Sequence, residues 1–182
     1  MLLTAAIALF LASVVLAGGR LGALAEVRFR HSWAALAGIA VQIAIISVVP
    51  AGSPGLHALV HVASYLLFGW FVFANRQLPG LGLIALGGAL NLTVISANDG
   101  LMPATRAALE AAGRDDATGQ FINSTTVAHP HLQFLGDVFA VPASWPVVHN
   151  VFSVGDVCLM VGAAVLLHGV CGSKLRLHPL GR

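Results

Sequence analysis

Five long apolar runs dominate the pattern of hydrophobic and polar positions along the chain. They cover residues 1–18, 32–50, 57–75, 79–97 and 153–171. Each run has roughly the 17–25 residues that a helix needs to cross the hydrocarbon core of a bilayer. An isolated strand in lipid would leave its backbone groups without hydrogen-bond partners, so we expect every run to be helical. The pattern therefore predicts an all-α membrane protein with five transmembrane helices.

The composition agrees with this pattern and changes little in it. Of the 182 residues, 58% are hydrophobic and 9% are charged, whereas roughly a quarter of an average soluble domain is charged. We therefore expect residues 1–182 to form a single membrane domain whose main partner is the lipid bilayer. The chain has no basic run of the kind that binds nucleic acid, so nucleic acid is not expected as a partner.

The basic residues are distributed unevenly around the apolar runs. Apart from Arg106 and Arg114, all of them lie in residues 19–31, in residues 75–78 or in the carboxyl-terminal tail. These three segments would share one face, and Lys and Arg favour the cytoplasmic side of short loops. The prediction is a multi-pass protein of the bacterial cytoplasmic membrane, with its amino terminus outside and its carboxyl terminus in the cytoplasm.

The long segment 98–152 is neither an apolar run nor a tight turn. It begins with the turn signal Asn-Asp-Gly, continues with a stretch typical of a short helix ending near Gly113, and is later interrupted by prolines. A loop of this length is usually functional or disordered, and its aromatic residues favour a position along the outer membrane interface. We expect a long extracytoplasmic loop between the fourth and fifth helices.

Two aspartates in this otherwise charge-poor region are the strongest candidates for chemistry. Asp156 begins the last apolar run, three positions after Ser153, which is the spacing of a helix capping box. Asp137 lies in the apolar stretch LGDVF, where an isolated carboxylate needs a partner and by default marks a site. Two carboxyls that meet in a low-dielectric mouth share a proton, so one can activate water and the other can protonate a leaving amine.

The residues around these aspartates resemble the lipoprotein signal peptidases, a family of membrane aspartyl peptidases. FSVGD at 152–156 is similar to that family's Phe-Asn-x-Ala-Asp motif, and LGGALN at 86–91 is similar to its Gly-Gly-x-x-Gly-Asn. The resemblance implies that Asp137 and Asp156 are catalytic, that Asn91 orients a carboxyl or a substrate amide, and that the substrate is a membrane-anchored peptide or lipoprotein. Ser and Gly replace the family's Asn and Ala in the first motif, and the Asp-Arg pair that follows the family's asparagine is missing.

A second resemblance covers most of the chain. The chain is similar to an uncharacterised family of small bacterial multi-pass proteins in three motifs, NxxVIxxNxGxMP at 91–103, FLGD at 134–137 and FSVGD at 152–156. This resemblance implies a shared fold and no activity. If the aspartates are catalytic, Asn98 and Asp99 in the first motif are candidates for the rim that binds substrate.

Histidines form a rival set of candidates. His57 and His61 are i, i+4 neighbours, and His129, His131 and His149 lie in the segment 98–152. The aspartyl hypothesis needs no metal and no cofactor, but these histidines could instead bind a metal or haem. Imidazole rings at such positions also serve as ordinary hydrogen-bonding groups between helices.

The histidine alternative belongs to a non-catalytic hypothesis, in which the chain is an accessory or structural subunit of a larger membrane complex. Asp137 would then pair with Arg106, Arg114 or a partner chain, and Asp156 would only cap its helix. A transporter or lipid-handling protein is a third hypothesis, disfavoured because the chain is short and no charged relay crosses the apolar runs.

Glycines are concentrated in the last two apolar runs. Positions 80, 82, 87, 88, 155 and 162 are all glycine. Small residues allow helices to approach closely. We therefore expect these two runs to pack against each other.

Overall fold

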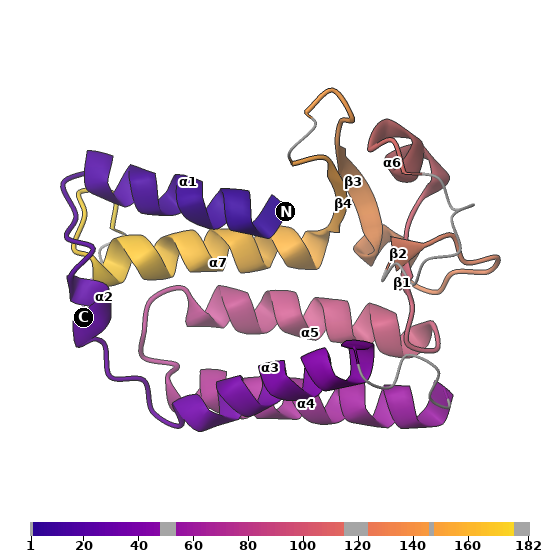
Figure 1. Ribbon diagram of the computed structural model, residues 1–182, viewed down its shortest axis with the longest axis horizontal. Helices are drawn as coiled ribbons and strands as arrows, with labels where there is room; N and C mark the ends of the chain where they lie inside the picture. Colours follow the sequence, from indigo (N-terminus) through magenta and orange to yellow (C-terminus); the bar gives the residue numbers. More distant parts are fainter. Residues whose placement is uncertain (1, 48–53, 115–123, 146–147, 177–182) are drawn as a thin grey trace.

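The computed structural model describes residues 2–47, 54–114, 124–145 and 148–176. A helix lies in each of the five apolar runs, and a short helix follows the first. The helices are α1 (Leu2–Leu16), α2 (Ala23–Glu26), α3 (Ser32–Ser47), α4 (Pro54–Ala74), α5 (Leu81–Ala97) and α7 (Val154–Val170). In Figure 1, α5 lies between α7 and the paired helices α3 and α4, and α1 lies along α7.

The prediction of a five-span membrane protein is wrong. Among the described residues, no helix combines the length and the apolarity needed to cross a bilayer. Helices α5 and α7, whose two ends are both described, contain 17 residues each. At a rise of 1.5 Å per residue they are about 26 Å long, which is less than the roughly 30 Å of a hydrocarbon core. The same finding contradicts the predicted multi-pass topology, the location in the cytoplasmic membrane and the assignment of the two chain ends to opposite sides.

Local signals at the ends of the apolar runs explain the short helices. Gly80 precedes α5 with a φ of 84°, a left-handed conformation that glycine adopts at little cost. The same helix ends at Asn98, whose backbone N–H donates to the carbonyl of Ile95. Ser153 caps the start of α7. A count of apolar residues does not register these signals, so it overestimates the lengths of α5 and α7.

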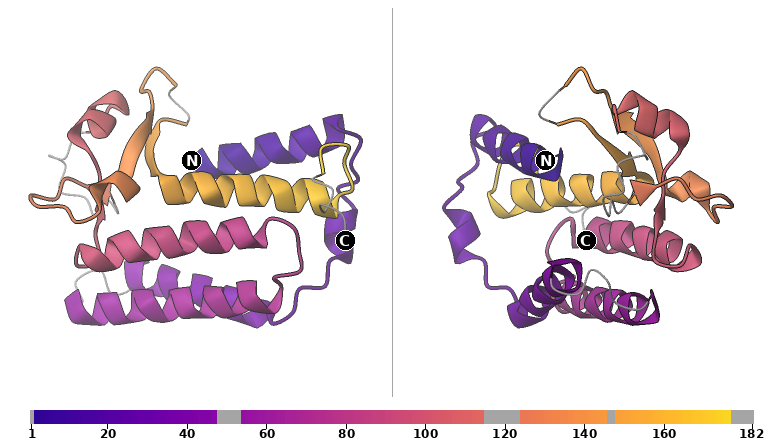
Figure 2. Two further views of the ribbon diagram at one scale, coloured as in Figure 1. Left: turned by 180° about the vertical axis from the view of Figure 1, so that it is seen from behind. Right: turned by 45° about the vertical axis from the view of Figure 1, so that its right-hand side comes forward.

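The segment 98–152 is not a loop but a small folded unit, which Figure 2 shows from two sides at one end of the helices. Its elements are β1 (Met102–Pro103), α6 (Arg106–Ala111), β2 (Ser124–Thr125), the 3-10 helix η2 (Gln133–Leu135), β3 (Asp137–Val141) and β4 (Asn150–Ser153). The predicted short helix before Gly113 is confirmed as α6. Ala108, Leu109 and Val151 belong to a buried apolar cluster inside this unit, which is why the segment folds on itself.

Two pairs of strands organise this unit. Strand β1 pairs with β2 in parallel, and β3 pairs with β4 in antiparallel orientation. A single parallel bridge joins Ala104 to Asp137, and the backbone N–H of Thr105 donates to the carbonyl of Asp137 at 3.1 Å. Asp137 therefore lies between the segment after β1 on one side and β4 on the other.

Helices α5 and α7 pack closely along a row of glycines, as the glycine pattern predicts. A β-carbon at Gly87 would lie 2.5 Å from the carbonyl oxygen of Gly155, and one at Gly162 would lie 2.9 Å from that of Gly80. Contacts this short leave no space for a side chain. This seam brings the carboxyl-terminal half of α5 against the first turn of α7.

Candidate functional site

Four polar residues from four elements meet where the small folded unit joins the helices. They are Asn91 of α5, Asp137 of β3, Ser153 of β4 and Asp156 of α7. We refer to them as the aspartate cluster. Asn91, Asp137 and Ser153 are buried, and Asp156 is partly exposed.

Ser153 and Asp156 form the predicted capping box, which is confirmed. The hydroxyl oxygen of Ser153 accepts a hydrogen bond from the Asp156 backbone N–H at 3.0 Å. In return, Oδ2 of Asp156 accepts from the Ser153 backbone N–H at 2.9 Å. The carboxylate thus lies at the amino end of α7, where the helix dipole favours a negative charge.

Asn91 connects both members of the capping box through its side-chain amide. Its Nδ2 donates to Oδ1 of Asp156 at 2.9 Å, and its Oδ1 accepts from the hydroxyl of Ser153 at 2.9 Å. Both carboxylate oxygens of Asp156 therefore accept a hydrogen bond within the fold. The glycine seam is what permits this arrangement, because a β-carbon at Gly155 would lie 2.6 Å from Cγ of Asn91.

A β-bulge turns Asp137 towards the cluster. In the β3–β4 register, Phe139 is opposite Phe152, and after a shift Asp137 is opposite Ser153. The two phenylalanine rings stack at 5.3 Å, and Phe139 is exposed. In a regular strand, residues two apart share a face, so Asp137 would point with Phe139. The bulge re-aims Asp137 to the buried face that carries Ser153, and it is 3% exposed there.

The register places Asp137 beside Ser153, the residue that is hydrogen-bonded to Asp156. Side chains of directly opposite residues in an antiparallel pair have β-carbons about 4.5–5.5 Å apart. Asp137 is opposite Ser153. The backbone N–H of Ser153 donates to the carboxylate of Asp156, and its hydroxyl donates to Asn91 and accepts from the backbone N–H of Asp156. Whether the two carboxyls share a proton stays a prediction.

Tyr65 of α4 is a further residue near the cluster and is not among the candidates that the sequence predicts. Burial raises the pKa of its phenol, and the negative charge of Asp156 raises it further. The effect of Asp156 indicates that α4 contributes to the surroundings of the cluster. One signal in the sequence could have identified this residue, because it is the only tyrosine in the chain and lies inside an apolar run.

The single tyrosine allows a direct test of this proximity. We expect an ultraviolet titration of the folded protein to show tyrosinate forming at a pH above the ordinary value of 10.0. Because the unfolded chain then loses this proton at lower pH than the folded one, stability should fall as the pH rises above about 10. The variant Asp156→Asn should titrate at lower pH than the wild type, though burial would keep the pKa raised. An unchanged titration in Asp156→Asn would place Tyr65 outside the reach of this carboxylate.

Asn98 and Asp99, the candidate rim residues, occupy the turn after α5. The side-chain amide of Asn98 is buried. Its Oδ1 accepts from the backbone N–H of His131 and its Nδ2 donates to the carbonyl of His131, both at 2.8 Å. The same Nδ2 also donates to the carbonyl of Val94. This pairing attaches the segment before β3 to the end of α5. Asp99 is exposed and has a φ of 54°. A role for either residue in substrate binding stays a prediction.

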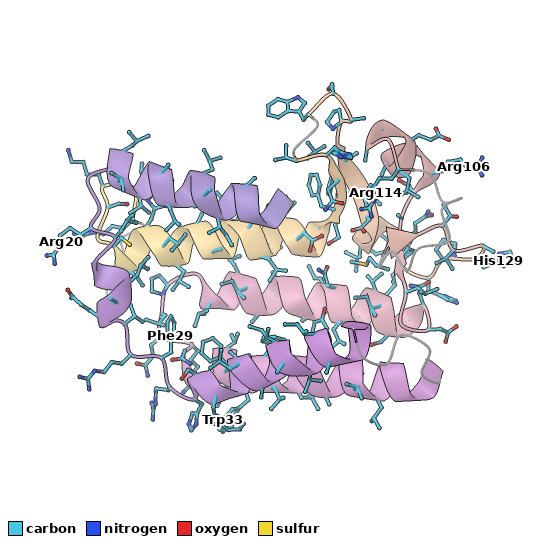
Figure 3. All side chains as sticks on the ribbon, viewed as in Figure 1. Arg20, Phe29, Trp33, Arg106, Arg114 and His129 are labelled. Carbon is cyan, nitrogen blue, oxygen red and sulfur yellow. The ribbon has the colours of Figure 1, made fainter. Side chains whose placement is uncertain are left out.

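The arginines of the non-catalytic hypothesis lie on and beside α6. Nη1 of Arg114 donates to Oδ1 of Asn150 at 2.6 Å. Figure 3 shows Arg106 projecting outwards at the edge of the small folded unit. Arg20 forms an exposed ion pair with Glu26 at 3.6 Å, at the opposite end of the molecule.

Of the five candidate histidines, the structure describes the side chains of His129, His131 and His149. His129 and His131 are exposed, and His149 bonds through Nδ1 to the carbonyl of Ala112 at 2.9 Å. The side chains of His57 and His61 lie outside the described residues. Among the side chains that the structure does describe, no group of three or more His, Cys, Asp or Glu is arranged to hold a metal ion. The metal or haem alternative therefore stays a prediction.

Comparison with known proteins identifies a family and no activity. Residues 26–168 match a family of unknown function, DUF5317, and this range contains the whole aspartate cluster. No curated protein and no solved structure matches the chain. The match confirms the predicted membership of an uncharacterised family. It does not show the three predicted motifs or the resemblance to signal peptidases. Since the match covers well over half of the sequence, the chain belongs to the DUF5317 family, whose function is unknown.

Proposed function

We propose that the aspartate cluster is the acid–base site of an aspartyl-type hydrolase that cleaves an amide bond in a peptide. Asp137 and Asp156 would share a proton, and Asn91 would position the carboxyl of Asp156. The observation that carries the proposal is the β3–β4 register, which has Asp137 opposite Ser153. Ser153 in turn bonds to both Asn91 and Asp156.

The proposed reaction uses the two carboxyls in opposite roles. The ionised carboxyl takes a proton from a water molecule as the water oxygen attacks the amide carbonyl. The protonated carboxyl then gives its proton to the departing amine as the carbon–nitrogen bond breaks. A carboxylate that accepts two hydrogen bonds retains lone pairs for such a water. Because a coupled pair titrates jointly, neither role is assigned to one aspartate alone.

Two features support the aspartyl mechanism over other hydrolytic mechanisms. The residue types match, since FSVGD at 152–156 and LGGALN at 86–91 resemble the catalytic motifs of lipoprotein signal peptidases. The exposures of the two acids also differ, because Asp137 is buried and Asp156 is partly exposed. Unequal environments favour unequal protonation of two carboxyls, which this mechanism requires.

The proposal is tested by incubating the purified protein with a proteome-derived peptide library in water enriched in the heavy oxygen isotope. We expect new peptide ends whose carboxyl groups carry the heavy isotope, because water supplies that oxygen. The variants Asp137→Asn and Asp156→Asn should each lose this activity. Glu110→Gln removes an exposed acid on α6 and should keep it. Cleavage that persists in either aspartate variant would contradict the proposal.

A purely structural role for the cluster is the second candidate, favoured by the complete capping box. Both oxygens of Asp156 already accept hydrogen bonds within the fold, as a structural acid requires. Under this alternative the chain would act as a non-catalytic subunit of a complex, the wild type would cleave nothing, and Asp156→Asn would lower stability only. Both oxygens of Asp156 accept from N–H donors, so the NH2 group of Asn at this position would face one of these donors. The variant should therefore be destabilised whether the cluster is catalytic or structural. Activity of the wild type is therefore the deciding measurement.

A further inference from the structure

Exposed aromatic and basic side chains gather at the end of the molecule opposite the small folded unit. They come from the segment before α3, from the start of α3 and from the last turns of α4. We define the aromatic–arginine patch as Phe29, His31, Trp33, Trp70, Phe73 and Arg76. Figure 3 shows Phe29 and Trp33 at this end, where α3 begins. This surface is separate from the aspartate cluster, and neither proposed function uses it.

Five of the six side chains of the patch form a continuous series, and Phe29 packs beside them on Phe71 at 5.7 Å. The ring of His31 lies 6.4 Å from that of Trp33 and 5.6 Å from that of Trp70. Trp70 stacks on Phe73 at 6.2 Å, and the guanidinium of Arg76 lies 4.5 Å from the centre of the Phe73 ring. Trp33 and Trp70 nevertheless remain 58% and 49% exposed. Large aromatic rings in such numbers on a surface indicate an interaction site.

The backbone beneath the patch is held in place by one buried side chain. Oδ1 of Asn75 accepts from the backbone N–H of Arg30 at 2.8 Å, and Nδ2 donates to the carbonyl of Arg30 at 2.8 Å. The same Nδ2 donates to the carbonyl of Phe71 at 2.7 Å. Asn75 thus joins the segment before α3 to the end of α4. The patch is therefore organised before any partner arrives.

Arg76 belongs to the patch, and two further exposed arginines lie next to Phe29 in the chain. Arg28 and Arg30 flank Phe29, and Arg76 follows α4. Between Glu26 and Asp99 the sequence contains no Asp or Glu. Positive charge without compensating acid favours an anionic partner.

We propose that the aromatic–arginine patch binds the headgroups of an anionic phospholipid surface. Tryptophan rings favour the headgroup layer, where their apolar body and their N–H group are both satisfied. Arginines close to an anionic lipid surface are attracted by its negative potential. The contact uses side chains alone, so no segment of the chain needs to cross the bilayer. An acidic protein segment would use the same charges, but the exposed indole rings on the ends of two helices favour the lipid surface.

The test is sedimentation of the full chain with vesicles. We expect binding to vesicles of mixed phosphatidylglycerol and phosphatidylcholine, and much weaker binding to vesicles of phosphatidylcholine alone. The double variant Arg28→Gln/Arg30→Gln should bind the anionic vesicles roughly 30-fold more weakly, because each arginine near such a surface contributes attraction of about one kilocalorie per mole. The double variant Trp33→Ala/Trp70→Ala should also lose binding, and the fluorescence of the wild type should shift to shorter wavelength with anionic vesicles.

Trp145 provides the matched control. It is 64% exposed but follows β3 in the small folded unit, so Trp145→Ala should bind vesicles like the wild type. Far-ultraviolet circular dichroism establishes that each variant is folded before it is compared. Equal binding to neutral and anionic vesicles, or an equal loss in Trp145→Ala, would overturn the proposal. Binding of a polyglutamate peptide that depends on Trp33 and Trp70, without vesicle binding, would identify an acidic protein partner instead and would overturn it too.

Discussion

Replacing Gly155 with alanine is expected to destabilise the fold by about 3 kcal/mol or more. The added β-carbon would lie against Oδ1 of Asn91 and 2.8 Å from the carbonyl oxygen of Gly87. The latter is backbone of the neighbouring helix and cannot rotate away. Helices α5 and α7 must therefore separate, which also pulls Asn91 away from Asp156. The free energy of unfolding in urea measures the effect.

Gly88→Ala is the matched control for this substitution. Gly88 lies next to Gly87 in α5, but a β-carbon there would meet nothing within 4 Å. Since glycine in a helix interior costs roughly 0.5–1 kcal/mol relative to alanine, we expect this variant to be as stable as the wild type or slightly more stable. Equal stability of Gly155→Ala and Gly88→Ala would show that the α5–α7 seam is not packed as described.

Replacing Asn91 with leucine should lower the free energy of unfolding by about 2–4 kcal/mol. Leucine fills a similar volume but offers no hydrogen-bonding groups. The buried hydroxyl of Ser153 then loses its acceptor, and Oδ1 of Asp156 loses its donor. An unsatisfied buried polar group costs more than the hydrogen bond itself contributes. The hydrolytic activity proposed for the cluster should disappear in the same variant, because Asp156 is no longer positioned.

Thr93→Val is the matched control, because it changes a polar residue of α5 close to Asn91 that does not belong to the cluster. Thr93 is exposed two residues further along α5, and its hydroxyl donates to the carbonyl of Ala89 at 2.8 Å. We expect a change within about 0.5 kcal/mol in denaturant unfolding, as for most surface substitutions. If Asn91→Leu proved equally mild, the ring of hydrogen bonds joining Asn91, Ser153 and Asp156 would not hold the two helices together.

Much of the site could be found from short patterns in the sequence. The spacing of Ser153 and Asp156 predicts a capping box, and the structure contains it. The glycines at 80, 87, 155 and 162 indicate a close pair of helices, and α5 and α7 form that pair. These features depend on residues a few positions apart or on small side chains, so local physical rules are sufficient to predict them.

The membrane prediction failed because hydropathy counts residues and does not see where a helix ends. The run at 1–18 is apolar almost throughout, yet α1 covers Leu2–Leu16. Turns and caps make α5 and α7 shorter than their apolar runs, and a few residues decide whether a helix can span a hydrocarbon core. The segment 98–152 was likewise predicted as a loop, because strands of two to five residues carry almost no periodic signal.

The position of Asp137 and the contribution of Tyr65 required the tertiary structure. The bulge between Asp137 and Phe139 reverses the face on which the aspartate points, and a shift of one residue in register is invisible in the alternation of a short strand. Tyr65 comes from a different helix, far away in the sequence, and only packing brings it near Asp156.

Local sequence patterns are sufficient to predict where helices form, how α7 is capped, and which two helices approach through glycine. These outcomes follow from interactions between near neighbours in the chain, whose geometry is set by the backbone. Only the tertiary structure brings α5, β3 and the β4–α7 junction together at one polar cluster and places aromatic rings and Arg76 side by side at the other end. Such meetings depend on strand register, helix length and packing, which are properties of the whole chain and not of any one segment.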